Sequence, residues 1–359
     1  MRSLLEKENP NSGDFSNFIA FTEISYGLYE RLLNPFEEEI KDKQLIIIPD
    51  NVLLLIPYEV LLTEKVSNTE PDYARLPYLL KSNNISYSYS ANLLFGNYLK
   101  NEGNKKNMVA FAPTYGHIQN LATDQLIALE PYRDFLVPIP GALEEVNQVV
   151  NIFGGKSFTG FDASKYYFVK NARDAGIIFL AMHALMDNSE PMFSTLAFTA
   201  DTVKNDNGLM YAYELYNSDI HARLAVLSAC NTGMGALKQG EGLMSMARAF
   251  ICAGVPSLVV NQWRVNDVVA KELMPTFMKN IKNGDQLDEA LRKARLNYLA
   301  NAPARLAHPH YWAGYVMLGD SSAIIKPNIR IYIILGVSVI VIILVSLLFY
   351  FRKFINLKF

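Results

Sequence analysis

The sequence predicts an α/β protein with a mostly parallel sheet flanked by helices, followed by one C-terminal transmembrane helix. Three observations lead to this prediction. Short apolar runs alternate with segments of helical periodicity along most of the 359 residues, a pattern typical of parallel sheets whose strands are joined by helices. Half of the residues are apolar, which is enough to bury a large core. Residues 331–351 form one long stretch without a charge.

The first half of the chain begins with a predicted amphipathic helix at 14–33, for which Asp14 is a suitable N-cap. A later segment, 141–155, also has helical period and ends in two glycines, which favour a helix C-terminus. Apolar or alternating runs of strand length predict strands between these helices, at 43–50, 85–90 and 107–113.

Two apolar runs in the second half end in chemically reactive residue types. "GIIFLAMH" (176–183) ends in His183, and "ARLAVLSAC" (222–230) ends in Cys230. Both runs are predicted as strands covered by helices on both faces. Because the carboxyl ends of parallel strands meet at one edge of a sheet, His183 and Cys230 are expected to be neighbours. Further elements are predicted after them: a helix at 240–254, a strand at 255–263, and helices at 266–281 and 285–301.

A cysteine beside a histidine can act as a nucleophile, since the imidazole accepts the thiol proton or pairs with the thiolate. Small residues follow both His183 and Cys230, so the backbone N–H groups of Ala184 and Cys230 are candidates for an oxyanion site. The alternatives remain a buried structural thiol and a hydrogen-bonded core histidine. The second cysteine, Cys252, lies within a predicted helix and is interpreted as a packing residue.

Composition excludes several classes of function. Four of the 33 basic residues and none of the 35 acidic residues lie in 329–359, so the rest of the chain carries a net charge of −6. A mildly acidic body argues against a nucleic-acid partner. Two cysteines form no disulfide framework, and neither they nor His308 and His310 show metal-ligand spacing, so we expect no metal or cofactor. The N-terminus shows no signal peptide.

The uncharged stretch "IYIILGVSVIVIILVSLLFYF" (331–351) predicts a single membrane-spanning helix. A helix of this length extends about 31 Å, which matches the hydrocarbon thickness of a bilayer. Basic residues stand on both sides of it, and aromatic residues lie near both ends. The lipid bilayer is therefore an expected partner. The basic tail favours a body outside the cytoplasm, whereas a lone C-terminal span favours a tail anchor, so the side of the membrane stays undecided.

Several separate motifs resemble the CHAT domain family, caspase-like peptidase relatives that are also similar to separases. The signature-like run is "LAVLSACNTGMGALKQGEGLMSMARAFICAGVPSLVVNQWRVND". Other similar stretches, in the family's order, are "LIIIPDNVLLLIPYEVLL", "YLLKSNNISYSYSANLL", "APTYG", "IPGALEEV" and "HPHYWAGYVMLGD". The resemblance assigns residues 1–320 to a CHAT domain, with 1–140 as its N-terminal half and 141–320 as its active-site half. A linker (321–330), the transmembrane helix (331–351) and a basic tail (352–359) follow.

The resemblance implies a caspase-like fold and a cysteine peptidase dyad, with His183 as the base and Cys230 as the nucleophile. The two residues are 47 positions apart (230 − 183), close to the spacing of about 50 in caspases. One departure is Ala184, where the family usually has glycine. Members commonly act in bacterial regulated proteolysis on protein or peptide substrates, often joined to tetratricopeptide repeats. This chain shows no such repeats. Either the sensor or activator is a separate protein, such as a tetratricopeptide-repeat protein, or the chain is a shortened form.

Three residues are candidates for the substrate pocket. Asp267, in "QWRVND", stands where separase-like relatives place an acidic residue that binds a basic P1 side chain. The alternative is that Asp267 caps the helix that begins near 268. Asp187 is a second acidic candidate, and Trp263 either packs in the core or forms a pocket wall. The leading hypothesis is a membrane-anchored cysteine endopeptidase, and the alternative is a catalytically silent module that recruits proteins.

Overall fold

The computed structural model describes residues 1–6, 13–67, 70–95, 107–115, 121–132, 134, 136–187, 189–228, 230–231 and 241–325. The chain divides into two units, Met1–Ile324 and Ile325–Phe359, and the α/β fold is the first of these. The predicted transmembrane segment 331–351 and basic tail 352–359, with the second half of the linker (326–330), lie outside the described residues. Within the ranges given above, no helix is both long enough and apolar enough to cross a bilayer.

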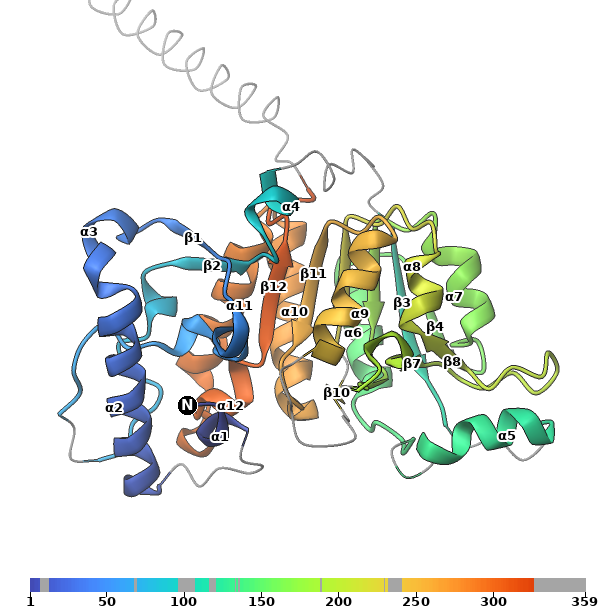
Figure 1. Ribbon diagram of the computed structural model, residues 1–359, viewed down its shortest axis with the longest axis horizontal. Helices are drawn as coiled ribbons and strands as arrows, with labels where there is room; N and C mark the ends of the chain where they lie inside the picture. Colours follow the sequence, from blue (N-terminus) through green and yellow to red (C-terminus); the bar gives the residue numbers. More distant parts are fainter. Residues whose placement is uncertain are drawn as a thin grey trace, which may run out of the picture. The chain divides into compact units, whose positions relative to one another are not determined.

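An eight-stranded sheet forms the centre of the fold (Figure 1). Neighbouring strands in the described sheet are parallel except for β11 and β12. Continuous apolar sequence makes its middle strands fully buried, as expected for strands with helices on both faces. In spatial order the strands are β1 (Gln44–Ile47), β2 (Asn84–Tyr87), β12 (Tyr315–Gly319), β11 (Ser257–Asn261), β9 (Leu224–Leu227), β5 (Ile177–Leu180), β3 (Met108–Pro113) and β4 (Lys156–Gly160).

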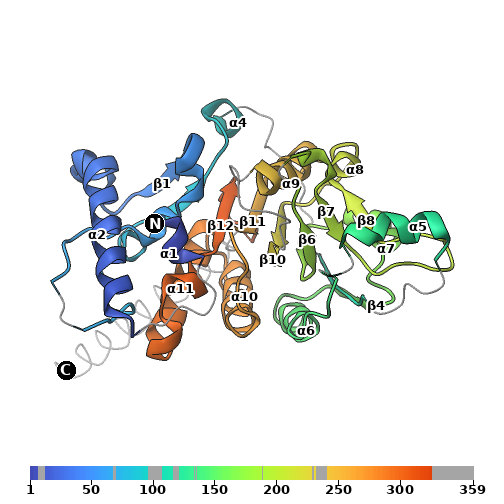
Figure 2. The ribbon, with the colours of Figure 1, turned by 60° about the horizontal axis from the view of Figure 1, so that its bottom comes forward.

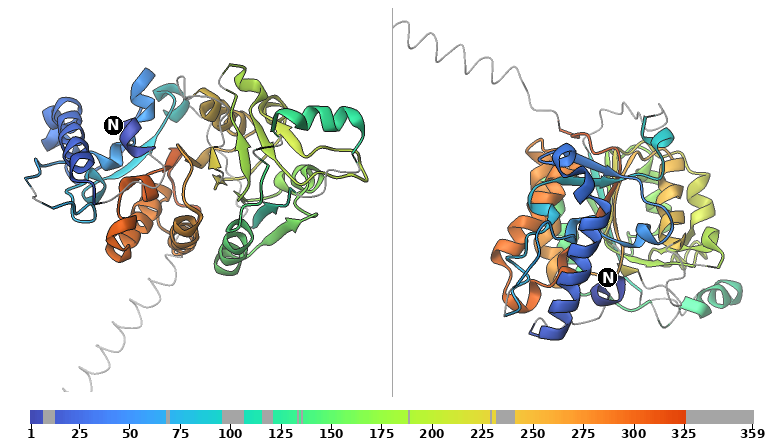
Figure 3. Two further views of the ribbon diagram at one scale, coloured as in Figure 1. Left: turned by 90° about the horizontal axis from the view of Figure 1, so that it is seen from below. Right: turned by 60° about the vertical axis from the view of Figure 1, so that its left-hand side comes forward.

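Helices cover both faces of this sheet, which Figure 3 shows from below. One face packs against α6 (Ala142–Phe153), α10 (Asp267–Lys282) and α11 (Leu287–Asn301). The other face shares a hydrophobic core with α7 (Lys165–Ala172), α8 (Ala212–Tyr216) and α9 (Glu241–Cys252). The α2 helix (Phe15–Leu32) lies beside β1 and is capped by Asp14, as the sequence predicts. The shorter helices are α1 (Arg2–Leu5), α3 (Glu37–Ile40), α4 (Ala91–Phe95), α5 (Thr123–Leu129) and α12 (Pro309–Trp312).

A second, smaller sheet contains the two residues that the sequence singles out. Its four strands are very short, and their spatial order is β10 (Cys230–Asn231), β6 (His183–Leu185), β7 (Thr195–Ala197) and β8 (Leu209–Tyr211). Figure 2 shows these strands side by side next to the central sheet. This sheet could not be predicted from the sequence, because strands of two or three residues show no recognisable periodicity.

The predicted strands 176–183 and 222–230 are each interrupted, which corrects the sequence analysis. The central-sheet strands β5 and β9 end at Leu180 and Leu227, and the chain then enters the small sheet. The β3–β5 register pairs Phe111 with Leu180, so its continuation sets Met182 opposite Pro113. Proline has no N–H to donate, so the pairing ends there. The prediction of a mostly parallel α/β sheet flanked by helices is confirmed.

Candidate active site

Cys230 and His183 are paired residues on neighbouring parallel strands of the small sheet. The same offset of 47 positions already holds in the central sheet, where Ile177 pairs with Leu224 and Leu180 with Leu227. Two residues follow each strand, 181–182 and 228–229, before pairing resumes. Because these two segments have equal length, the register carries over unchanged from β5–β9 to β6–β10. The backbone thus brings the two predicted residues together, while the side chain of Cys230 lies outside the described part.

The imidazole of His183 is buried and held by one backbone carbonyl. Its Nε2 lies 2.6 Å from the carbonyl oxygen of Val137. A carbonyl oxygen only accepts hydrogen bonds, so Nε2 carries the proton and donates it. The other ring nitrogen, Nδ1, is buried and has no hydrogen-bond partner among the described residues. This tautomer leaves an unprotonated nitrogen on His183, which is the state that a general base requires.

Tyr115 fixes the backbone of His183. The His183 N–H donates to the Tyr115 hydroxyl at 3.0 Å, and that hydroxyl donates to the Ala197 carbonyl oxygen at 3.0 Å. The two rings also pack together, with centroids 4.9 Å apart. Tyr115 therefore connects the segment after β3 to both β6 and β7. Its position in the quoted motif "APTYG" is the only signal that the sequence offers for it.

The electrostatic surroundings keep His183 neutral. Burial lowers the pKa of His183, and the charge of Arg264 lowers it further, whereas the Val137 hydrogen bond and the charge of Asp267 act in the opposite direction. The net result is a pKa below the ordinary value. The imidazole is consequently neutral near neutral pH, and its unprotonated Nδ1 is able to accept a proton.

Asp267 lies close to this site. It is the first residue of α10, but the cap is the preceding Asn266, whose side chain accepts a hydrogen bond from the Val268 N–H. A Cβ placed on Gly141 would lie 3.0 Å from the Cβ of Asp267, so the start of α6 and the start of α10 are in contact there. The half-buried Asp267 carboxylate is also near enough to act on the pKa of His183.

The other two pocket candidates make structural contacts. Asp187 closes its own turn, since its Oδ1 accepts hydrogen bonds from Ser189 and Glu190. Burial raises the pKa of Asp187, but the hydrogen bonds from Ser189 and Glu190 outweigh this effect, so the pKa lies below its ordinary value. Trp263 is 4% exposed, and its indole N–H donates to the His310 carbonyl oxygen at 2.7 Å. Their roles in substrate binding stay predictions.

Ala184 and Cys252 complete the set of residues considered from the sequence. Ala184 lies between two strands, paired with Leu196 on one side and Asn231 on the other. The suggested oxyanion role of its N–H stays a prediction. The interpretation of Cys252 as a packing residue is wrong, because this cysteine is exposed.

A buried polar group adjoins the segment before Cys230 and was missed from the sequence. Ser228 donates a hydrogen bond to the Glu145 carboxylate at 2.6 Å, and its oxygen lies 3.0 Å from the Tyr315 hydroxyl. Burial raises the pKa of Glu145 to about 8. Glu145 lies in the quoted motif "IPGALEEV", although the motif alone does not distinguish it from its neighbour Glu144.

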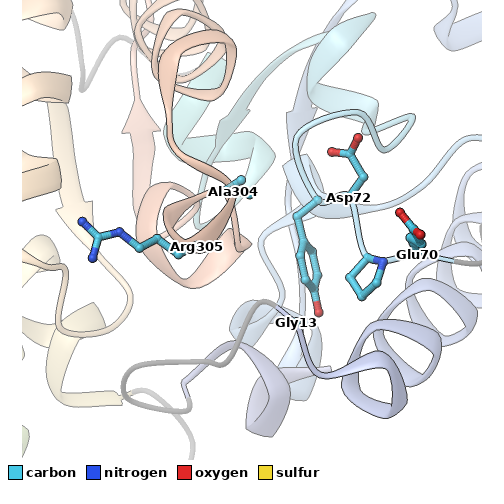
Figure 4. Close-up of a pocket in the computed structure, with 8 residues that line it drawn as sticks. Gly13, Glu70, Asp72, Ala304 and Arg305 are labelled. Carbon is cyan, nitrogen blue, oxygen red and sulfur yellow. The ribbon is translucent and has the colours of Figure 1, made fainter.

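A cavity of about 440 Å³ opens elsewhere in the described structure, between residues 70–73 and 304–307 (Figure 4). Its charged lining residues are Glu70, Asp72 and Arg305. The guanidinium of Arg305 points away from both carboxylates. The charged groups do not converge on one position, so the cavity has no arrangement suited to a specific ligand.

A family model described as the CHAT domain matches residues 22–320. This chain belongs to the CHAT domain family. The sequence resemblance to that family is therefore confirmed, over most of the α/β fold described above.

Two curated proteins similar to this chain are the human and mouse forms of tetratricopeptide repeat protein 28. The human protein is 22% identical over 345 residues, which cover 84% of this chain and 13% of that protein. The mouse protein is 22% identical over 227 residues, which cover 53% of this chain and 9% of that protein. The CHAT chain thus corresponds to a small part of each of these much longer relatives.

Solved structures with a similar arrangement include two proteins. The Saccharomyces cerevisiae separase–securin complex has a TM-score of 0.41 and 13% identity, covering 76% of this chain and 15% of that chain. The Arg-specific cysteine proteinase gingipain R has a TM-score of 0.46 and 10% identity, covering 85% of this chain and 67% of that chain. At these scores the similarity says nothing about the site.

Proposed function

We propose that this CHAT protein is a caspase-like cysteine endopeptidase with a His183–Cys230 dyad. The observation that carries the proposal is the backbone register, in which Cys230 is the paired residue of His183. The tautomer of His183 adds to it, since the Val137 carbonyl holds the proton on Nε2 and leaves Nδ1 as the base.

In the proposed reaction Nδ1 of His183 takes the thiol proton of Cys230, and the sulfur attacks the carbonyl carbon of the scissile peptide bond. The resulting oxyanion is stabilised by the backbone N–H groups of Ala184 and Cys230. The C–N bond then breaks as the imidazolium returns its proton to the leaving amine, which leaves a thioester. Water, deprotonated by His183, hydrolyses the thioester, releases the carboxylic acid and regenerates the thiol.

We also propose a preference for a basic P1 residue. The half-buried Asp267 carboxylate lies near His183 and is the acidic group best placed to pair with an arginine or lysine side chain. Asp187 is less suited, because its Oδ1 is already occupied by its own turn. Trp263 is buried, so its proposed contribution is packing behind the pocket.

Membrane attachment and a protein activator are further parts of the proposal. The uncharged segment 331–351 supports a single-pass anchor. Separation of membrane and soluble fractions tests this, comparing the full chain with a chain that ends at Arg330. A tetratricopeptide-repeat protein is the proposed activator, since both curated relatives carry these repeats in their names. Pull-down with the intact chain is the corresponding measurement.

The test of the peptidase is labelling by an electrophilic peptide that ends in arginine or lysine, with and without cell lysate as a source of activator. The wild-type chain is expected to be labelled at Cys230. Cys230→Ala should abolish labelling, and His183→Ala should reduce its rate by orders of magnitude. Labelling that persists in Cys230→Ala would count against the dyad.

One observation favours a second function, that of a catalytically silent recruiting module. Ala184 replaces the usual glycine and lies between two paired strands, which narrows the room near its N–H. If neither preparation labels Cys230 while the protein still captures specific partners, this alternative replaces the peptidase.

A further inference from the structure

The buried carboxylic acid of Glu145 has no part in the dyad chemistry described above. Its residue is only 4% exposed, and no salt bridge of Glu145 is found within the described residues. Burying a carboxyl group costs free energy unless hydrogen bonds inside the protein replace those it made to water. The partner of Glu145 is Ser228, which stands two residues before Cys230.

The hydrogen bonds form a directed chain. Ser228 has a single hydroxyl hydrogen, and it is donated to Oε1 of Glu145 at 2.6 Å. In the 3.0 Å contact between Ser228 and Tyr315 the tyrosine hydroxyl must therefore be the donor. The chain runs from Tyr315 of β12 through Ser228 to Glu145 of α6. It joins two elements of the scaffold to the segment between β9 and β10.

These hydrogen bonds affect the position of Cys230, because Ser228 lies in the segment that leads to it. Ser228 immediately follows β9, where the backbone leaves the central sheet, and β10 resumes at Cys230. On the neighbouring strand, residues 181–182 likewise connect β5 of the central sheet to His183 at the start of β6. A fixed Ser228 restricts how the backbone can reach Cys230, and thus the register that pairs Cys230 with His183.

We propose that Glu145 is a positioning residue whose carboxyl group, through Ser228, anchors the segment that carries Cys230 opposite His183. Glu145 acts on the reaction only through Ser228, which Tyr315 also holds. The inference rests on the proposed dyad for its importance to catalysis, but the anchoring itself is independent of which substrate is cleaved.

The charged and titratable groups around Glu145 come from two packed elements. Asp267 and Lys271 of α10 act on its pKa in opposite directions, and Tyr315 of β12 reaches it through Ser228. Glu144, the preceding residue on α6, points elsewhere: its carboxylate is half exposed and pairs with Lys271. Glu144 is therefore a matched control on the same helix turn.

The experiment measures how fast iodoacetamide alkylates Cys230 in the full chain, in a Cys252→Ala background that removes the exposed second thiol. Glu145→Ala and Ser228→Ala are expected to slow alkylation of Cys230 by about ten- to a hundredfold. Glu145→Gln keeps an acceptor for Ser228 and should retain most of the rate. Glu144→Ala should leave the rate unchanged.

Thermal unfolding of each variant accompanies the rates, so that loss of fold is separated from loss of position. If Glu145→Ala does not fold, the smaller change Ser228→Ala decides the question. Wild-type rates in folded Ser228→Ala would overturn the inference, as would equal losses in Glu145→Gln and Glu145→Ala. A slow rate restored by glutamine supports the inference even if the peptide probe labels no variant, an outcome that would reject the peptidase alone.

Discussion

The central sheet and the small sheet of this CHAT protein differ in how their strands are made. The strands β5 and β9 are four-residue runs in which every side chain is buried. In contrast, β6 and β10 have three and two residues, and their pairing continues the register that β5 and β9 set before them. The central sheet therefore stabilises the fold, and the small sheet positions His183 and Cys230 relative to each other. This division makes separable predictions for the two regions.

The largest expected effect comes from breaking the register between the sheets. One alanine inserted between Ala181 and Met182 shifts His183 by one residue, which turns its side chain to the opposite face or misaligns it with Cys230. Labelling of Cys230 by the peptide probe should fall by more than about a hundredfold. The control is an alanine inserted after Val203, which is 93% exposed in the turn between β7 and β8. Equal labelling of the two insertions would refute the role of the register.

Substitutions in the central sheet should lower the free energy of unfolding. Phe179 lies within β5 and is fully buried, so Phe179→Ala should lower the free energy of unfolding by about 3–5 kcal/mol. Val203→Ala, at an exposed position, should change it by no more than about 0.5 kcal/mol. Urea denaturation followed by circular dichroism measures both. A small effect at Phe179 would contradict the division between the sheets.

Glu145 links the two regions and should make stability depend on pH. Its pKa of about 8 in the folded protein exceeds the ordinary 4.5, so the folded state keeps a proton that the unfolded state releases in this range. Folding stability should thus decline as pH rises from about 4.5 to about 8. Glu145→Gln should reduce this decline by a few kcal/mol. The measurement is the difference between wild-type and variant unfolding free energies at pH 5, 6.5 and 8, since the difference removes the contribution of other groups.

The smallest effects are expected from the charges near His183. Asp267→Asn removes a negative charge and should lower the pKa of His183, whereas Arg264→Gln removes a positive charge and should raise it. The acid limb of the labelling rate against pH should move in the corresponding directions. Asp267→Asn should also weaken the preference for a basic P1 residue. Movement of the two variants in the same direction would exclude this electrostatic account of the site.

Much of the scaffold could be predicted because its signals are local. The apolar runs around β1, β3 and β11, the Asp14 cap and the glycines after α6 each identify an element from neighbouring residues alone. The ends of the apolar runs were harder to interpret. The break after Leu180 depends on Pro113 in another strand, which no periodicity within 176–183 can indicate.

The candidate site divides in the same way. His183 and Cys230 could be selected from the sequence, because few residue types support nucleophilic chemistry and both follow apolar strands. The Val137 carbonyl could not be selected, since every residue has one, and Glu145 could not be told from Glu144 before packing buried one and exposed the other.

The sequence by itself determined the α/β class, the family and the two candidate residues of the dyad, because composition, periodicity and motif order are properties of the chain read in one direction. Only the tertiary structure decided the register of β6 against β10, the tautomer of His183 and the burial of Glu145. These three depend on distances between segments far apart in the chain, and such distances are fixed when the sheet and its helices pack together.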